Sequence, residues 1–114
     1  MSSHPAIKWH ELFSKFGHDA GFVKDLLGVV VETNCSVPAS LREAARSSDL
    51  PTIEKLAHRV KGTAGDLVAH ACQDLARQTE LAARDAEPST TVLSLQLADA
   101  LDAMLDEVRS HLAR

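Results

Sequence analysis

The side chains of this sequence that could do chemistry at neutral pH gather around one histidine. His58 is followed by Lys61 about one helical turn on, and Lys55 and Arg59 flank it, in a chain whose formal net charge is -4. A neutral imidazole can attack phosphorus to form a phosphoramidate, and a nearby ammonium can offset the phosphoryl charge. Three interpretations of His58 are open at this point: a nucleophile, a metal ligand, or a surface residue without a role.

A metal site is the weakest of these interpretations. The chain has no His-Glu-x-x-His and no Glu-x-x-His pair, which zinc proteases and di-iron bundles require. We interpret the remaining histidines as surface residues without a role: His4, His10, His18, His70 and His111.

Two glycines follow His58 on the outward face of its predicted helix. Gly62 and Gly65 lie one and two turns beyond the histidine, and Glu54 lies one turn before it. A glycine in a helix interior costs ~1 kcal/mol relative to alanine, and two of them need a reason. Since both point away from the apolar stripe, we interpret them as a bare strip over which another molecule approaches His58.

The apolar spacing predicts the elements that position these residues. We expect a short helix after Pro5 that ends at Gly17, then four long helices over residues 19–47 (capped by Asp19 and bent at Pro38), 48–67, 69–84 and from about 91 to the end. Short connections between long helices are typical of an antiparallel bundle. The sequence therefore predicts one all-α domain over residues 1–114, an antiparallel four-helix bundle with an additional short N-terminal helix.

Composition excludes several classes of protein. With 12 Lys+Arg against 16 Asp+Glu, a general nucleic-acid binder is not expected. No apolar run approaches the ~18 residues of a membrane span, and the N-terminus lacks a signal-peptide pattern. We expect Cys35 and Cys72 to be buried cytosolic thiols. The acidic residues of the last helix are interpreted as a solvated face: Asp99, Asp102, Asp106 and Glu107.

The run Ala-His-Arg-Val-Lys-Gly-Thr-Ala-Gly at residues 57–65 resembles the signature of histidine-containing phosphotransfer (HPt) domains. That signature has an alanine and the phosphorylated histidine, then after two residues a Lys-Gly followed by small residues. With the flanking helices, the similarity covers about residues 19–82 and includes Glu80 in the following helix. Two positions depart from the family: Val68 replaces a usual glycine, and Thr79 replaces a leucine-type residue.

The resemblance implies that His58 accepts and donates a phosphoryl group, that Lys61 steadies it, and that Gly62 leaves room for a receiver domain. The other candidate docking residues are Gly65, Glu54, Lys55 and Arg59. The resemblance also implies that the protein is a phosphocarrier of a bacterial two-component phosphorelay and not a kinase. It implies no cofactor or metal on this chain, with Mg²⁺ held by the receiver. We expect a cytoplasmic monomer that binds response-regulator receivers and a hybrid sensor kinase, without contact to nucleic acid or membrane.

Three alternatives remain. The dimerisation and phosphoacceptor domain of a sensor kinase usually has an acidic residue after the histidine and a proline soon afterwards, but here Arg59 follows and the next proline is Pro88. A helical adaptor would leave the two glycines unexplained. An enzyme with its own small substrate is least expected, because the sequence indicates no second catalytic group near His58.

Overall fold

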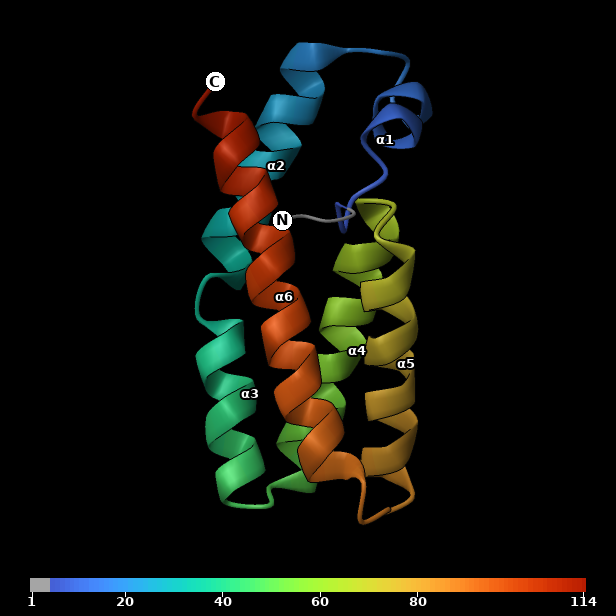
Figure 1. Ribbon diagram of the computed structural model, residues 1–114, viewed down its shortest axis with the longest axis vertical. Helices are drawn as coiled ribbons and strands as arrows, with labels where there is room; N and C mark the ends of the chain where they lie inside the picture. The colour runs from blue at the N-terminus through green and yellow to red at the C-terminus, as the bar shows by residue number, and fades with distance from the viewer. Residues whose placement is uncertain (1–4) are drawn as a thin grey trace.

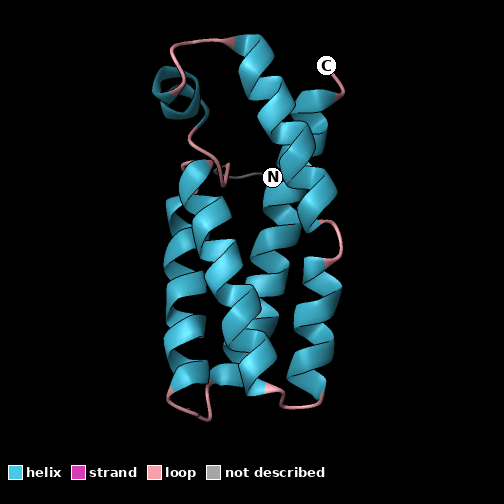
Figure 2. Ribbon diagram, turned by 180° about the vertical axis from the view of Figure 1, so that it is seen from behind, coloured by secondary structure: helices cyan, strands magenta, loops and turns pink. Residues whose placement is uncertain are grey.

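The computed structural model describes residues 5–114, which form six α-helices and no strand; His4 lies outside the described residues. The helices are α1 (Trp9–Lys15), α2 (Ala20–Asn34), α3 (Val37–Arg46), α4 (Leu50–Asp66), α5 (His70–Arg84) and α6 (Thr90–Leu112). After α1, the chain runs down through α2 and α3 and then alternates in direction through α4, α5 and α6 (Figures 1 and 2). The predicted antiparallel bundle with a short N-terminal helix is confirmed.

The prediction of one bent helix over residues 19–47 is wrong, because α2 and α3 are separate. The chain turns at Cys35 and Ser36, and Pro38 lies in the first turn of α3. A proline is well tolerated there, since the first amides of a helix have no intrahelical acceptor. Asn34 and Val37 are both buried, which keeps the apolar side of the two helices facing the same core. The turn also exposes Cys35, which corrects the expectation of a buried thiol, whereas Cys72 is buried.

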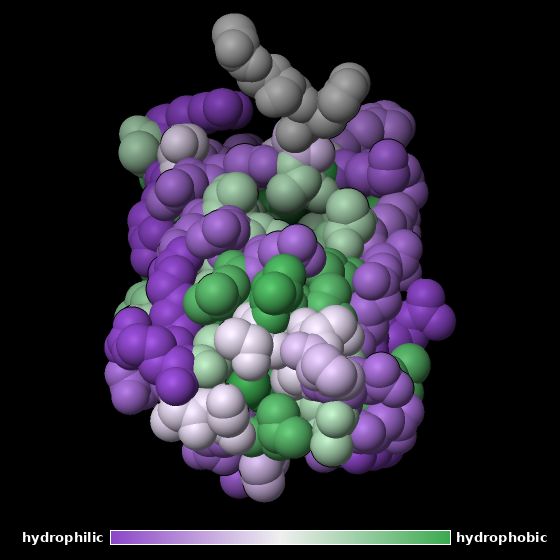
Figure 3. Space-filling view, turned by 60° about the horizontal axis from the view of Figure 1, so that its bottom comes forward, coloured by the Kyte–Doolittle hydropathy of each residue, from purple (hydrophilic) through white to green (hydrophobic). Residues whose placement is uncertain are grey.

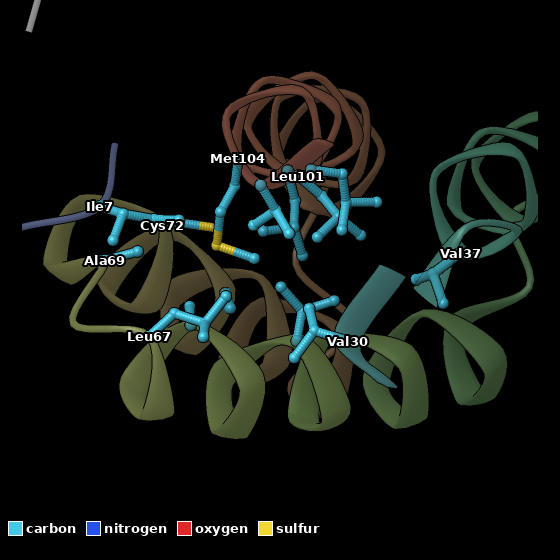
Figure 4. Close-up of a cluster of buried hydrophobic side chains, with 14 of the residues drawn as sticks. Ile7, Val30, Val37, Leu67, Ala69, Cys72, Leu101 and Met104 are labelled. Atoms are coloured by element: carbon cyan, nitrogen blue, oxygen red, sulfur yellow. The ribbon is translucent and has the colours of Figure 1, made fainter. Parts of the chain in front are cut away.

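The core is built from aliphatic side chains of every long helix (Figure 4). Val30 and Val37 reach it from α2 and α3, Cys72 from α5, and Leu101 and Met104 from α6. All are at most 7% exposed. Trp9, Phe13 and Phe16 from the N-terminal segment pack against this cluster.

The N-terminal segment is held to α6 and α4. Glu107 accepts hydrogen bonds from the backbone amides of Ala6 and Ile7 and from Trp9 Nε1 (3.3 Å), and the Trp9 ring stacks on His111 at 4.6 Å. Glu107 and His111 therefore both hold the N-terminal segment. This corrects the prediction that Glu107 belongs to a solvated face and that His111 is a surface residue without a role. At the other end of α1, Lys15 Nζ lies 3.0 Å from the carbonyl oxygen of Asp66, where an ammonium offsets the negative end of α4.

The predicted acidic face of α6 is paired rather than merely solvated. Arg42 of α3 lies 2.7 Å from a carboxylate oxygen of both Asp99 and Asp102, and Asp106 pairs with Arg109 on its own helix. The first two contacts link α3 to α6 across the surface of the bundle.

Apolar side chains also reach the surface at the end of the bundle where α5 joins α6, and Figure 3 shows apolar groups gathered there within a hydrophilic border. The large exposed residues near this end are Leu81 in α5 and Val92 and Leu95 in α6.

Among the described residues, none of the helices combines the length and apolar character that a membrane crossing needs.

Three helices end in the same backbone motif. Ser48, Val68 and Ala86 follow α3, α4 and α5 with φ of 52°, 55° and 53°. In each case the residue and its successor donate amide hydrogen bonds back into the last turn, for example Ala86 to the carbonyl of Ala83 (3.2 Å). Glycine usually occupies this left-handed position because a Cβ is strained there.

We expect Ala86→Gly to raise the free energy of unfolding by about 0.5–1 kcal/mol, because it removes that strain from an exposed residue. The matched control is Ala103→Gly, at an exposed position inside α6, which should lower the free energy of unfolding by about the same amount. Urea denaturation measures both. A loss of stability in Ala86→Gly would contradict the assignment of strain.

Candidate functional site

The apolar stripe of α4 turns His58 toward solvent, as the sequence predicts. Ile53, Ala57, Val60 and Ala64 are fully buried on the opposite side of the helix, and the His58 side chain is 69% exposed. Asp49 fixes the start of α4 by accepting hydrogen bonds from the amide and hydroxyl of Thr52. The helix therefore presents the imidazole from a rigid frame.

A buried carboxylate of α5 organises the groups around His58. The Glu80 side chain is only 6% exposed. Its Oε2 lies 2.8 Å from His58 Nδ1 and its Oε1 lies 2.8 Å from Lys61 Nζ. Arg84, one turn along α5, places Nη2 at 3.4 Å from Oε2. Glu80 thus gathers donors from both α4 and α5.

This environment keeps Glu80 ionised at neutral pH. The hydrogen bond from Lys61 is the main cause that lowers the pKa of Glu80 below its ordinary value, and that from His58 adds to it, against the opposing effect of burial. A carboxylate can only accept hydrogen bonds, which means that Nδ1 of His58 must donate. Neutral His58 therefore carries its proton on Nδ1 and leaves the lone pair on Nε2.

The predicted docking residues do not all lie together. Glu54 and Lys55 line a depression of about 440 Å³ beside His58, together with Pro51, Glu80 and Arg84. Arg59 points toward α2 instead, where its guanidinium donates to the carbonyl oxygen of Thr33 near the end of that helix. The structure therefore gives Arg59 a contact that ties α4 to α2.

The two glycines of α4 have different surroundings. A Cβ at Gly62 would meet no atom within 4 Å, which agrees with the predicted open strip. A Cβ at Gly65 would lie 2.6 Å from Nε2 of Gln73 on α5. The interpretation that Gly65 points away from packing is therefore wrong, because the flexible end of the Gln73 side chain lies against it.

The structure adds Glu80 to the residues around His58, and the sequence marks this residue only by its resemblance to the family. A signal for its burial exists in the sequence. Glu80 lies four residues after Ala76 and three before Ala83, and both alanines are buried, which puts the carboxylate on the inward face of α5. A charged residue on such a face needs partners, and His58 and Lys61 supply them.

A helical bundle that displays a histidine backed by a carboxylate and a lysine has the groups that a covalent carrier on an imidazole needs. The family model named Hpt domain matches residues 25–111, most of the chain, and the chain belongs to this family. Hpt domains are the histidine phosphotransfer modules of phosphorelays, phosphocarriers that interact with receiver domains and kinases. Comparisons with curated proteins and with solved structures give no significant match.

The two departures from the family pattern fit the same backbone. Val68 occupies the left-handed position after α4, where a glycine would be unstrained, and its side chain is buried in the core with 8% exposure. Thr79 is fully buried and its hydroxyl donates to the carbonyl of Leu75 at 2.7 Å, which satisfies the polar group inside α5. The polar group of Thr79 is therefore satisfied within α5, whereas Val68 retains the strain of a β-branched residue at positive φ.

We expect Glu80→Gln to lower the free energy of unfolding at pH 7 by roughly 1–2 kcal/mol, because Lys61 and His58 lose a buried carboxylate. The folded-state pKa of Glu80 is below the ordinary 4.5. The ionised carboxylate therefore contributes its full stabilisation of the fold above pH 4.5, and this stabilisation disappears as the pH falls through the folded-state pKa. Urea denaturation of both chains between pH 3 and pH 7 measures the difference.

The matched control is Glu32→Gln, at an exposed glutamate of α2, which should change stability by less than about 0.5 kcal/mol throughout. A difference between Glu80→Gln and the parent chain that stays the same at low and neutral pH would show that the charge of Glu80 does not stabilise the fold.

Proposed function

We propose that His58 is the residue of this Hpt domain that receives and passes on the phosphoryl group, through Nε2. The observation that carries the proposal is the 2.8 Å contact between Nδ1 of this exposed histidine and the buried carboxylate of Glu80. A hydrogen bond at Nδ1 fixes the tautomer and the orientation of the ring, in the way that a carboxylate orients the histidine of a catalytic triad. Nε2 is then the nucleophile.

The transfer step balances without a free proton. The lone pair of Nε2 forms a bond to phosphorus, the bond from phosphorus to the aspartyl oxygen of the receiver breaks, and the aspartate leaves with that electron pair as a carboxylate. The ring of His58 becomes an imidazolium that still has its proton on Nδ1. Glu80 stabilises that positive charge, and the reverse reaction follows the same path.

Lys61 is proposed to stabilise the phosphoryl group. Its side chain is 32% exposed, and its ammonium is held 2.8 Å from Glu80, one turn from His58. A lysine side chain has a flexible stem and three donors, and it can turn toward phosphoryl oxygens while it remains close to the carboxylate. Lys61 therefore supplies a positive charge that is already in place.

The remaining chemistry is assigned to the partner. We propose that Mg²⁺ is held by the receiver, that this chain needs no cofactor or metal, and that it does not phosphorylate itself from ATP. Receiver domains of response regulators and a hybrid sensor kinase are the proposed partners, with docking over Gly62 and Lys55. Four points stay predictions of this proposal: a single domain over residues 1–114, a monomeric state, a bacterial origin and a cytoplasmic location.

We expect His58→Gln to abolish uptake of acid-labile phosphate from phosphorylated receiver domains, because Nε2 is the proposed acceptor. The matched control is His70→Gln, an exposed histidine at the start of α5, which should react at the rate of the parent chain. Radiolabel on the chain after incubation with a labelled receiver and Mg²⁺ is the measurement. Unchanged labelling of His58→Gln would disprove the assignment.

We expect Gly62→Gln to leave the melting temperature at or above that of the parent chain while the rate of transfer from the receiver falls. The position is open within this chain, and a long side chain there would block only an approaching partner. The matched control is Gly62→Ala, which should stabilise the helix by about 0.5–1 kcal/mol and retain more of the transfer rate. Full transfer by a folded Gly62→Gln would show that the receiver does not approach over this turn.

A further inference from the structure

A depression next to His58 contains an ion pair to which the phosphotransfer signature assigns no role. Glu54 lies one turn before His58 on α4, and Arg84 lies one turn after Glu80 on α5. Arg84 Nε is 3.1 Å from Glu54 Oε2. Both side chains line the depression of about 440 Å³ that His58 and Glu80 also line. A group bound to His58 would therefore share this depression with the ion pair.

Arg84 is tied to the same oxygen that orients His58. Its Nη2 lies 3.4 Å from Glu80 Oε2, the atom that accepts the hydrogen bond from His58 Nδ1. A guanidinium has five N–H donors in a fixed plane, and these two contacts leave several of them available. Arginine binds phosphoryl oxygens well because its planar fork matches their spacing.

Charged side chains are paired around His58 before transfer. Glu80 pairs with Lys61 and Glu54 pairs with Arg84, and Lys55 lines the same depression. Transfer adds two negative charges on the phosphoryl group and one positive charge on the ring, and the site gains one net negative charge. The phosphoryl group would then compete with Glu54 for the guanidinium of Arg84.

We propose that Arg84 is a second cation that binds the phosphoryl group on His58, and that Glu54 weakens this binding by competing for Arg84. The ion pair would then set the equilibrium constant for exchange of the phosphoryl group between His58 and the receiver domain. This inference rests on the function proposed above for His58.

The equilibrium constant of the exchange tests the inference, because it depends on the free species and not on how they dock. The parent chain, Glu54→Gln, Arg84→Gln and the double variant are each mixed with the same radiolabelled receiver domain and Mg²⁺. The ratio of label on the two proteins is read once it is constant. Docking residues alter the forward and reverse rates together and leave this ratio unchanged.

We expect Glu54→Gln to shift the ratio roughly threefold toward the chain and Arg84→Gln to shift it roughly threefold toward the receiver, as for a partly exposed ion pair. The double variant should match Arg84→Gln, because Glu54 then has no cation to compete for. Arg77→Gln is the matched control; it removes an exposed ion pair with Asp74 on α5 and should leave the ratio unchanged.

Two results would overturn the inference. Either the ratio is the same for all four chains, or Glu54→Gln shifts it equally with and without Arg84, which would mean simple repulsion and no competition. A parent chain that takes up no label from any receiver, or a His58→Gln chain that still takes it up, would instead disprove the proposed function. The two failures are therefore distinguishable.

Discussion

The ionised carboxylate of Glu80 is the constraint on which the site depends. A buried charge is costly unless donors surround it. The donors here are His58 and Lys61 of α4 and Arg84 of α5 itself. Because they come from two helices, the carboxylate fixes how α4 is turned against α5 at the level of His58. The same contact that stabilises the helix pair holds the proton of His58 on Nδ1, which makes packing and chemistry depend on one group.

The rest of the fold holds α4 in place around this contact. Lys15 of α1 covers the last carbonyls of α4, Arg59 ties its middle to the end of α2, and Gly65 allows Gln73 of α5 to approach closely. The open surface at Gly62 is left over after these contacts. A phosphocarrier needs little more than this, since a rigid, exposed nucleophile lets the partner bring the reacting phosphate to it.

Local patterns in the sequence predict much of this structure. The apolar stripe of α4 places His58 outward, and Asp19 and Asp49 mark helix starts through hydrogen bonds to residues three positions on. The apolar spacing continues from α2 into α3 across the break before Pro38. For that reason it predicts one bent helix instead of two separate helices. The roles of Glu80 and Gly65 depend on contacts between different helices, with Glu80 22 residues from His58 in sequence, and no local periodicity determines which side chains meet there.

The nitrogen that carries the phosphoryl group tests the central claim most directly. The measurement is ³¹P and ¹⁵N NMR of the ¹⁵N-labelled chain after phosphorylation by a receiver domain, read as the coupling between phosphorus and one ring nitrogen. We expect coupling to Nε2 of His58, with Nδ1 still protonated toward Glu80. A phosphoryl group on Nδ1 would need the Glu80 hydrogen bond to break. That result, or phosphate on any other residue, would contradict the proposed roles of His58 and Glu80.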